Sequence, residues 1–158
     1  MAGTEASDIA HDFVQQLTPS LRRFARALAA DRDGGLVAEE LLKTALDRLP
    51  SHGSATAHLK TALYAGIVHT YRNRPLAAAT DAPSRARHGI VQQIDRLPLD
   101  QREVLLLVVL ERLRYDEVAA ILSLPRSSVV ARLARARAAL APLSEETPSR
   151  PAYLRVVK

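Results

Sequence analysis

The sequence contains no cysteine and no tryptophan, and aromatic residues make up only 4% of its 158 residues. Without cysteine the chain can form neither disulfides nor thiolate metal sites, and a reducing cytosol suits it. Its apolar residues are mainly alanine, leucine and valine, and it has only six glycines. Because β-branched and aromatic runs are scarce, this composition predicts an all-α fold.

Long apolar runs are also missing from the sequence. The longest, Val104–Leu110, falls far short of the ~20 residues that a helix needs to span a bilayer. The first residues, MAGTEASDIAHDF, are acidic and lack an apolar stretch, so we expect no secretion signal. We therefore predict no membrane span and a cytoplasmic location.

Catalytic and ligand-binding patterns are likewise not found. The five histidines are scattered without metal-ligand spacing, and the sequence has no glycine-rich phosphate loop. Glu39 and Glu40 are adjacent on an expected helix, so their carboxylates point to different faces. We predict no catalytic residue, no metal, no cofactor and no small-molecule substrate, and hence a protein that is not an enzyme.

Basic residues outnumber acidic residues in the sequence. The formal net charge is +5, the sequence pI is about 10.1, and arginine far outnumbers lysine. Such an excess of positive charge indicates a polyanionic partner, although a basic face that is only exposed to solvent produces the same composition. The arginine bias favours phosphate and base recognition, because a guanidinium group offers a bidentate fork of donors.

Apolar periodicity divides the chain into two helical stretches. The spacing of leucines predicts amphipathic helices around 17–28, 36–49 and 57–71, and further helices after residue 89. Between these stretches, the sequence PLAAATDAPSRARH has two prolines and no apolar period. We predict two small helical domains, 8–74 and 89–143, joined by a linker at 75–88 and followed by a flexible tail at 144–158.

The second stretch has the pattern of a helix-turn-helix. Asp100 is placed to cap a first helix, with Glu103 three residues later as in a capping box, and the apolar run that follows is expected to be helical. After a break at Leu113-Arg114, a short helix is predicted over Tyr115–Leu122. Pro125 then marks a turn, because proline ends one helix and fits the first turn of another.

The last predicted helix, Arg126–Leu140, has the composition of a DNA-reading helix. Its valines and leucines recur at helical spacing, whereas Ser128, Arg132 and Arg135 share a different face. It carries four arginines and no acidic residue. We expect the guanidinium groups to project outward together, as entry into the major groove requires. The alternative is a basic helix that is only exposed to solvent. The elements before it, a buried helix, a short helix and a turn marked by proline, favour DNA binding over this alternative.

The string LPLDQREVLLLVVLERLRYDEVAAILSLPRSSVVARLARARAAL resembles region 4 of the extracytoplasmic-function (ECF) sigma factors of bacterial RNA polymerase. In that family, region 4 is a helix-turn-helix that binds the −35 promoter element and touches the polymerase flap. The chain departs from the family pattern in having Ser123 for a usual glycine and Val130 for a usual basic residue. The resemblance assigns upstream-element binding to Arg126, Ser127, Ser128, Val130, Arg132, Arg135 and Arg137.

The N-terminal stretch is similar, more distantly, to region 2 of the same family. In that family, one helix grips the polymerase clamp and the next melts and reads the −10 element. Gly35, Ala38 and Ala62 replace usual acidic, glutamine and tryptophan residues. The resemblance assigns polymerase binding to Glu39, Glu40 and Lys43, and downstream-element binding to His69, Tyr71, Arg72, Asn73 and Arg74. A simple solvated helix end explains the latter residues equally well.

Two functions follow from the resemblance. The chain is either an ECF sigma factor that joins core RNA polymerase and promoter DNA, or a sigma-like decoy that binds an anti-sigma factor and frees the true sigma factor. Sigma-like domains of some stress-response regulators act as decoys, but they accompany a receiver domain, for which this chain has no room. The degraded region 2 positions favour the decoy and the arginine-rich helix favours the sigma factor. An anti-sigma partner is implied in both cases.

Overall fold

The computed structural model describes residues 2–30, 35–49, 56–74 and 89–141, with side chains described from residue 9 in the first helix and residue 58 in the third. All regular structure within these ranges is helical, which confirms the predicted all-α class. The predicted linker and flexible tail lie outside the described residues. The elements are α1 (Ala2–Leu28), α2 (Leu36–Asp47), α3 (Thr56–Arg72), α4 (Ile90–Arg96), α5 (Leu99–Leu105), η2 (Leu106–Leu110), α6 (Tyr115–Leu122) and α7 (Arg126–Leu140).

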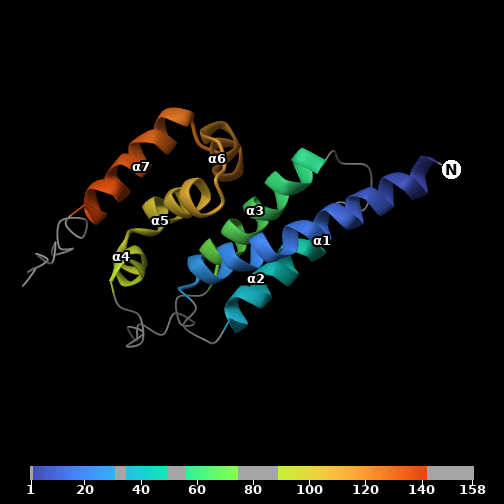
Figure 1. Ribbon diagram of the computed structural model, residues 1–158, viewed down its shortest axis with the longest axis horizontal. Helices are drawn as coiled ribbons and strands as arrows, with labels where there is room; N and C mark the ends of the chain where they lie inside the picture. Colours follow the sequence, from blue (N-terminus) through green and yellow to red (C-terminus); the bar gives the residue numbers. More distant parts are fainter. Residues whose placement is uncertain (1, 31–34, 50–55, 75–88, 142–158) are drawn as a thin grey trace, which may run out of the picture.

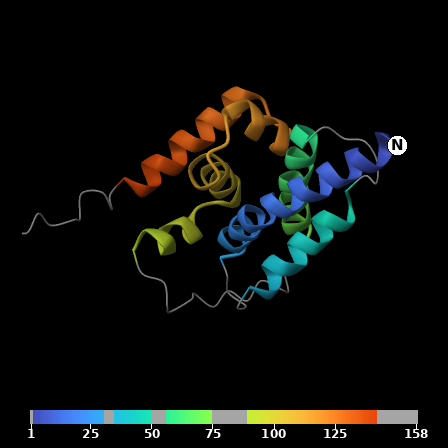
Figure 2. The ribbon, with the colours of Figure 1, turned by 45° about the vertical axis from the view of Figure 1, so that its right-hand side comes forward.

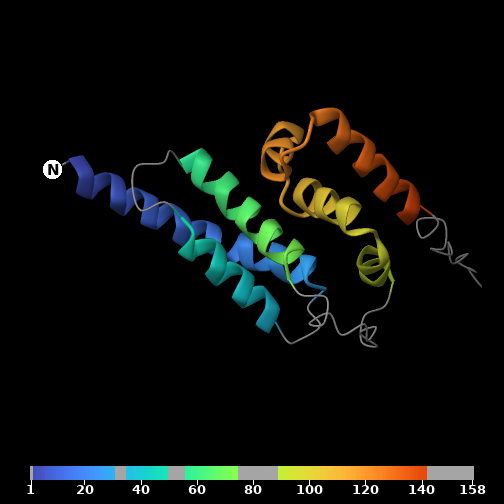
Figure 3. The ribbon, with the colours of Figure 1, turned by 180° about the vertical axis from the view of Figure 1, so that it is seen from behind.

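Helices α1, α2 and α3 pack side by side as an N-terminal group (Figures 1 and 3). Phe24 of α1 meets Tyr64 of α3 edge to face, with ring centroids 5.3 Å apart, and both rings are buried. Gly66 lets α3 approach α2 closely, since a Cβ at this position would lie 3.2 Å from the Cβ of Ala45. The first turns of α1 extend beyond the other two helices (Figure 1).

Helices α4 to α7 form the C-terminal group, in which α6 and α7 make the predicted helix-turn-helix (Figure 2). Both of these helices have the predicted bounds, and Pro125 precedes α7 in an extended conformation. The apolar run after α5 stays helical as predicted, although Leu106–Leu110 is wound as a π-helix. It buries Leu106 and Leu107 against the rest of the protein.

The predicted cap at Asp100 is wrong. Helix α5 begins two residues earlier than that cap requires, and its N-cap is Pro98, whose backbone is extended. Asp100 therefore lies within the first turn, and Glu103 lies in the helix interior, where it is fully buried. Both carboxylates pair with arginines of other helices, which are described below.

Two corners of the C-terminal group place non-glycine residues in the left-handed region. Ser123, after α6, has φ 53°, and Arg112, after η2, has φ 54°. Left-handed backbone costs an L-residue about 1–2 kcal/mol because its Cβ crowds the carbonyl oxygen. Ser123, which replaces a usual glycine of the family pattern, is thus a strained corner, and Arg112 is a second one.

The two groups of helices share one continuous apolar core. Helix α3 packs against α6, and α1 packs against η2. Buried residues of both groups, such as Ile67 of α3 and Val118 of α6, belong to the same cluster. The two groups are consequently in direct contact over a seam between α1 and α3 on one side and α5, η2 and α6 on the other.

Candidate nucleic-acid interface

Helix α7 lies along one edge of the molecule and packs against α5 and α6 (Figure 1). Val129, Leu133 and Ala136 are buried and recur at helical spacing, so they fix which face of the helix is turned inward. This is the apolar stripe that the sequence predicts. The remaining faces of α7 are open to solvent or only partly covered.

The arginines of α7 do not all project outward together, contrary to the prediction. At about 3.6 residues per turn, Arg132 and Arg135 fall on one flank of the helix and Arg126 and Arg137 on the opposite flank. Between the flanks runs an exposed ridge of small residues, which are Ser127, Ala131, Ala134 and Ala138. A narrow ridge with guanidinium groups on both sides allows the helix backbone to come close to a groove while the arginines reach its walls.

The four arginines differ in how strongly carboxylates hold them. Within the described part of the chain, no carboxylate lies within ion-pair distance of Arg135 or Arg137, and both side chains are exposed. Arg126 is 3.7 Å from Asp116, but both side chains are more than half exposed, so the pair is weak. Arg132 is 24% exposed and turns back toward Asp100 of α5, with its Nε 3.6 Å from the carboxylate.

The other residues assigned to the upstream element lie at or near the start of α7. Ser127 and Val130 are exposed, and Ser128 is half-buried. The positive end of the helix dipole, at this N-terminus, adds to the attraction for a phosphate. The exposed part of α7 thus carries the hydroxyl of Ser127 and the guanidinium groups of three arginines, and the helix itself has no acidic residue.

The end of α3, where the downstream-element residues were placed, is engaged within the protein. Arg72 donates a bidentate pair of hydrogen bonds to Glu103, with Nε 2.9 Å from Oε1. Hydrogen bonding to this carboxylate raises the pKa of Arg72 above its ordinary value. The hydroxyl of Tyr71 accepts a hydrogen bond of 3.4 Å from Arg102.

The remaining downstream-element residues also have partners nearby. Arg74 is 3.2 Å from a carboxylate oxygen of Glu40 on α2. The amide of Asn73 donates to the backbone carbonyl of His69 at 2.8 Å and lies 3.1 Å from its ring. The structure therefore brings these five residues together at one helix end, but it holds them in contacts within the protein.

The residues assigned to polymerase binding lie on the outer side of α2. Glu39 is 2.6 Å from the Nε of Arg22 and 4.0 Å from Arg26, both on α1. Glu40 faces Arg74, as described, and Lys43 is exposed. Two of these three residues are thus partly neutralised by cations of neighbouring helices.

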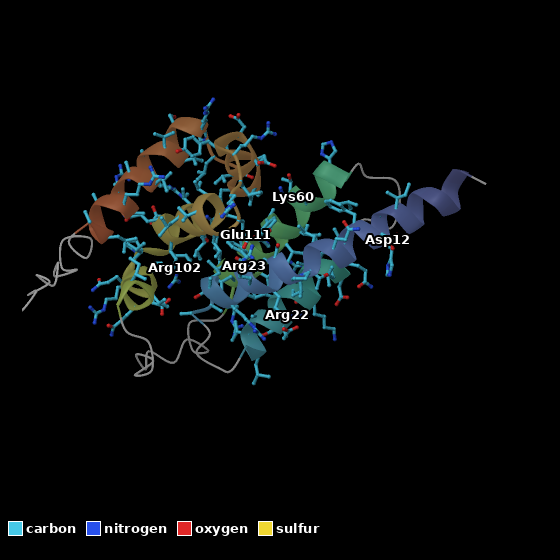
Figure 4. The ribbon with its side chains drawn as sticks, in the orientation of Figure 1. Asp12, Arg22, Arg23, Lys60, Arg102 and Glu111 are labelled. Carbon is cyan, nitrogen blue, oxygen red and sulfur yellow. The ribbon has the colours of Figure 1, made fainter. Side chains whose placement is uncertain are left out.

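The most strongly held charges of the seam were not identified from the sequence. The side chain of Glu111 is 2% exposed, accepts two hydrogen bonds of 3.1 Å from Arg23, and accepts another of 2.8 Å from the Tyr64 hydroxyl (Figure 4). Burial, followed by the hydrogen bond to Glu111, raises the pKa of Tyr64 well above its usual range. Lys60 lies 3.4 Å from Glu117 further along the seam.

A signal for these contacts exists in the sequence. Glu103 and Glu111 flank the longest apolar run of the sequence, Val104–Leu110, and a carboxylate that is buried beside such a run needs a partner. The partners are 31 and 88 residues away, however, and no local pattern identifies them.

Other kinds of site are not evident in the described part of the chain. No group of three or more histidine, aspartate or glutamate side chains there is arranged to hold a metal ion. None of the helices in the same part combines the length and apolar character needed to cross a membrane.

Comparison with known proteins relates the chain to one protein family, as the following matches show. The domain family described as Sigma-70, region 4, matches residues 87–140. The chain is 30% identical over 155 residues to the ECF RNA polymerase sigma factor EcfG of Rhodopseudomonas palustris (strain TIE-1), covering 87% of this chain and 86% of that protein. It also resembles the sigma factor RpoE of Bartonella quintana, solved in complex with the anti-sigma factor NepR. That likeness has a TM-score of 0.59 at 25% identity, and it covers 86% of this chain and 98% of the other.

Proposed function

Because the chain belongs to the family of ECF RNA polymerase sigma factors, we propose that it joins core RNA polymerase and directs it to a promoter through helix α7. The observation that carries the DNA-binding part is the surface of α7. Its arginines flank a ridge of small exposed residues, and two of them, Arg135 and Arg137, have no carboxylate nearby among the described residues. Region 4 of a sigma factor reads the upstream promoter element with the corresponding helix.

We expect phosphate contacts to dominate the affinity for DNA, and base contacts to set the preference for sequence. With about four to six phosphate contacts, log K should fall against log salt with a slope of roughly −4 to −5. Arginines of α7 that reach a guanine edge should each contribute ~1–3 kcal/mol to discrimination between sequences.

Helix α2 is proposed as the surface that docks on the polymerase. Lys43 is exposed on it, and Leu36 at its start is 75% exposed, which is unusual for so large an apolar side chain. Glu39 and Glu40 would have to exchange their present arginine partners for polymerase groups. Because the carboxylates of Glu39 and Glu40 are 47% and 65% exposed, that exchange costs little.

An anti-sigma factor is proposed as the regulatory partner, and the cytoplasm as the place of action. The structural relative from Bartonella quintana was solved with an anti-sigma factor, which supports a partner of that class for this chain. Both named relatives are sigma factors, which favours the sigma function over a decoy.

Run-off transcription with purified core RNA polymerase tests the proposal directly. A pool of genomic promoter fragments serves as the template, and the matched control is a chain with Arg135→Ala and Arg137→Ala. We expect a transcript with a defined start from the wild-type chain and little or none from the control. If the chain does not bind core polymerase, yet binds an anti-sigma factor tightly, the decoy function is correct instead.

A further inference from the structure

Val130 is a large apolar side chain on the exposed surface of α7. It is 46% exposed, although its neighbour Val129 is completely buried. The other exposed residues of this helix are arginines, alanines and one serine, namely Arg126, Ser127, Ala131, Ala134, Arg135, Arg137, Ala138 and Ala139. On this surface Val130 is therefore the one side chain with a branched apolar group.

Packing within the protein does not explain a valine at this position. The buried stripe of α7 faces α5 and α6, and at about 100° per residue Val130 lies roughly a quarter of a turn away from it. Val130 does not belong to the apolar core or to the partly buried side chains that pack against it. Valine also favours a helix less than alanine does. The apolar surface of Val130 is consequently available to a partner of the chain.

The place of Val130 on α7 is suited to a contact with bases. It follows Arg126 by four residues and precedes Arg137 by seven, so the three side chains share one flank of the helix. It is also the fifth residue of α7, and the N-terminal part of the second helix of a helix-turn-helix is the part that contacts base edges. With the two arginines on the phosphates, this flank would bring Val130 to the floor of the groove.

The chemistry of valine limits what it can recognise there. Its side chain has neither a donor nor an acceptor, so it cannot read the hydrogen-bonding groups of the bases. The major groove presents one apolar group, the 5-methyl group of thymine. A valine in a helix is held almost entirely in one rotamer, so its two methyl groups lose little entropy when they make a contact.

We propose that Val130 contacts the 5-methyl group of a thymine in the upstream element and makes the chain prefer thymine at that position. The proposal rests on the DNA-binding function proposed above for α7, and it adds the chemical group that one residue reads. Because no charge takes part, this preference is independent of salt, whereas the affinity supplied by arginine contacts with phosphates falls as salt rises.

Duplexes with and without the methyl group test the proposal. The full chain, bound to core RNA polymerase, first selects its preferred duplexes from a pool in which the upstream element is randomised. Each thymine of a selected element is then replaced in turn by uracil, which keeps the hydrogen-bonding groups and lacks the methyl group. Affinity is measured by gel shift at several salt concentrations.

Two variants of the full chain are compared with the wild type. Val130→Ala removes the proposed contact, and it should keep the fold because alanine favours the helix. Val109→Ala is the matched control, since it removes the same apolar atoms from an exposed valine of η2. Circular dichroism checks that both variants fold.

We expect one uracil substitution to weaken binding of the wild type and of Val109→Ala about fourfold, the effect of one methyl group that is no longer buried. Val130→Ala should bind the thymine and uracil duplexes equally. Where cytosine occupies the same position, 5-methylcytosine should strengthen binding of the wild type by a similar factor and leave Val130→Ala unchanged. The fourfold ratio should stay constant as the salt concentration changes.

The two proposals fail in different ways. If no uracil substitution weakens the wild type more than it weakens Val130→Ala, Val130 does not read a methyl group, and the proposed function stands. The same conclusion holds if the selected elements carry no thymine. If the chain with core polymerase selects no duplex at all, both proposals are wrong.

Discussion

Helix α7 and the end of α3 both carry arginines assigned to DNA, but their surroundings differ. On α7, two of the four arginines face solvent without a carboxylate among the described residues. At the end of α3, Arg72 is held by a buried glutamate and Arg74 by a glutamate on the surface. The comparison teaches that arginine content alone does not define a binding surface, because a cation paired inside the protein must first lose its partner.

Arg72, the last residue of α3, and Arg74, just after it, should differ most in how much each stabilises the fold. Arg72→Ala leaves the carboxylate of Glu103 buried without its partner, which should lower the free energy of unfolding by about 3 kcal/mol. This is near the low end for a broken buried pair, since Arg72 is 40% exposed and its loss lets water reach the site. Arg74→Ala breaks a pair with a well exposed glutamate and should cost less than about 1 kcal/mol. Urea denaturation of both variants measures the difference, and equal losses would contradict the account.

A second variant tests whether the seam joins the two groups of helices energetically. Tyr64→Phe removes the hydroxyl that donates to Glu111, and it should lower the free energy of unfolding by ~1.5–3 kcal/mol. Tyr115→Phe is the control, because the half-buried side chain of Tyr115 makes no hydrogen bond through its hydroxyl within the described residues. Thermal unfolding of the two variants should separate them, and the same melting temperature for both would show that the contact with Glu111 contributes nothing.

Relieving the strained backbone at a corner of the C-terminal group should raise the stability of the protein, whereas the substitutions above lower it. Ser123→Gly relieves a left-handed backbone at the end of α6, with a gain of about 0.5–1 kcal/mol after the entropy that glycine loses on folding. Ser127→Gly, within α7, should instead destabilise by about 0.5–1 kcal/mol, since it weakens a helix without relieving strain. Chemical denaturation measures both changes, and a loss of stability for Ser123→Gly would refute the strain argument.

The smallest expected effect is on the pH dependence of the protein's stability, through Glu117 of α6. The backbone N–H of Arg114 donates to Glu117 at 2.8 Å and holds the pKa of this carboxyl below 4.5, with Lys60 adding to the effect. A folded-state pKa below the unfolded one contributes stability that is present above about pH 4.5 and is lost as the pH falls through the folded pKa. Glu117→Gln should therefore cost about 0.5 kcal/mol at neutral pH, because the amide oxygen can still accept from Arg114, and nothing in strong acid. A pH series of melting temperatures checks this, and a constant difference at all pH values would contradict it.

Local patterns in the sequence predicted most of the helices. The bounds of α6 and α7 follow from apolar spacing and from Pro125, which act over a few residues. The all-α class follows from composition in the same way. Capping at Asp100 was predicted wrongly, because Pro98 starts the helix earlier and Arg132 offers the carboxylate a distant partner.

The candidate site could be predicted only in part, for a related reason. The residues of α7 lie on the helix as the spacing requires, and the buried stripe is the predicted one. Which arginines are free depends on carboxylates brought in by other helices. The pairs of Arg72 with Glu103 and of Arg23 with Glu111 arise from tertiary packing, and nothing within a turn of either arginine indicates them.

The measurement that tests α7 most directly is the salt dependence of promoter DNA binding by the full chain. Two proteins are compared with the wild type: Arg135→Ala with Arg137→Ala, and Arg48→Ala with Lys43→Ala, which removes the same charge from exposed positions of the N-terminal group. If α7 contacts DNA, the first should flatten the slope of log K against log salt by about 2 and the second should leave it nearly unchanged. If both proteins keep the wild-type slope, or if the second flattens it as much as the first, α7 is not the DNA-binding surface.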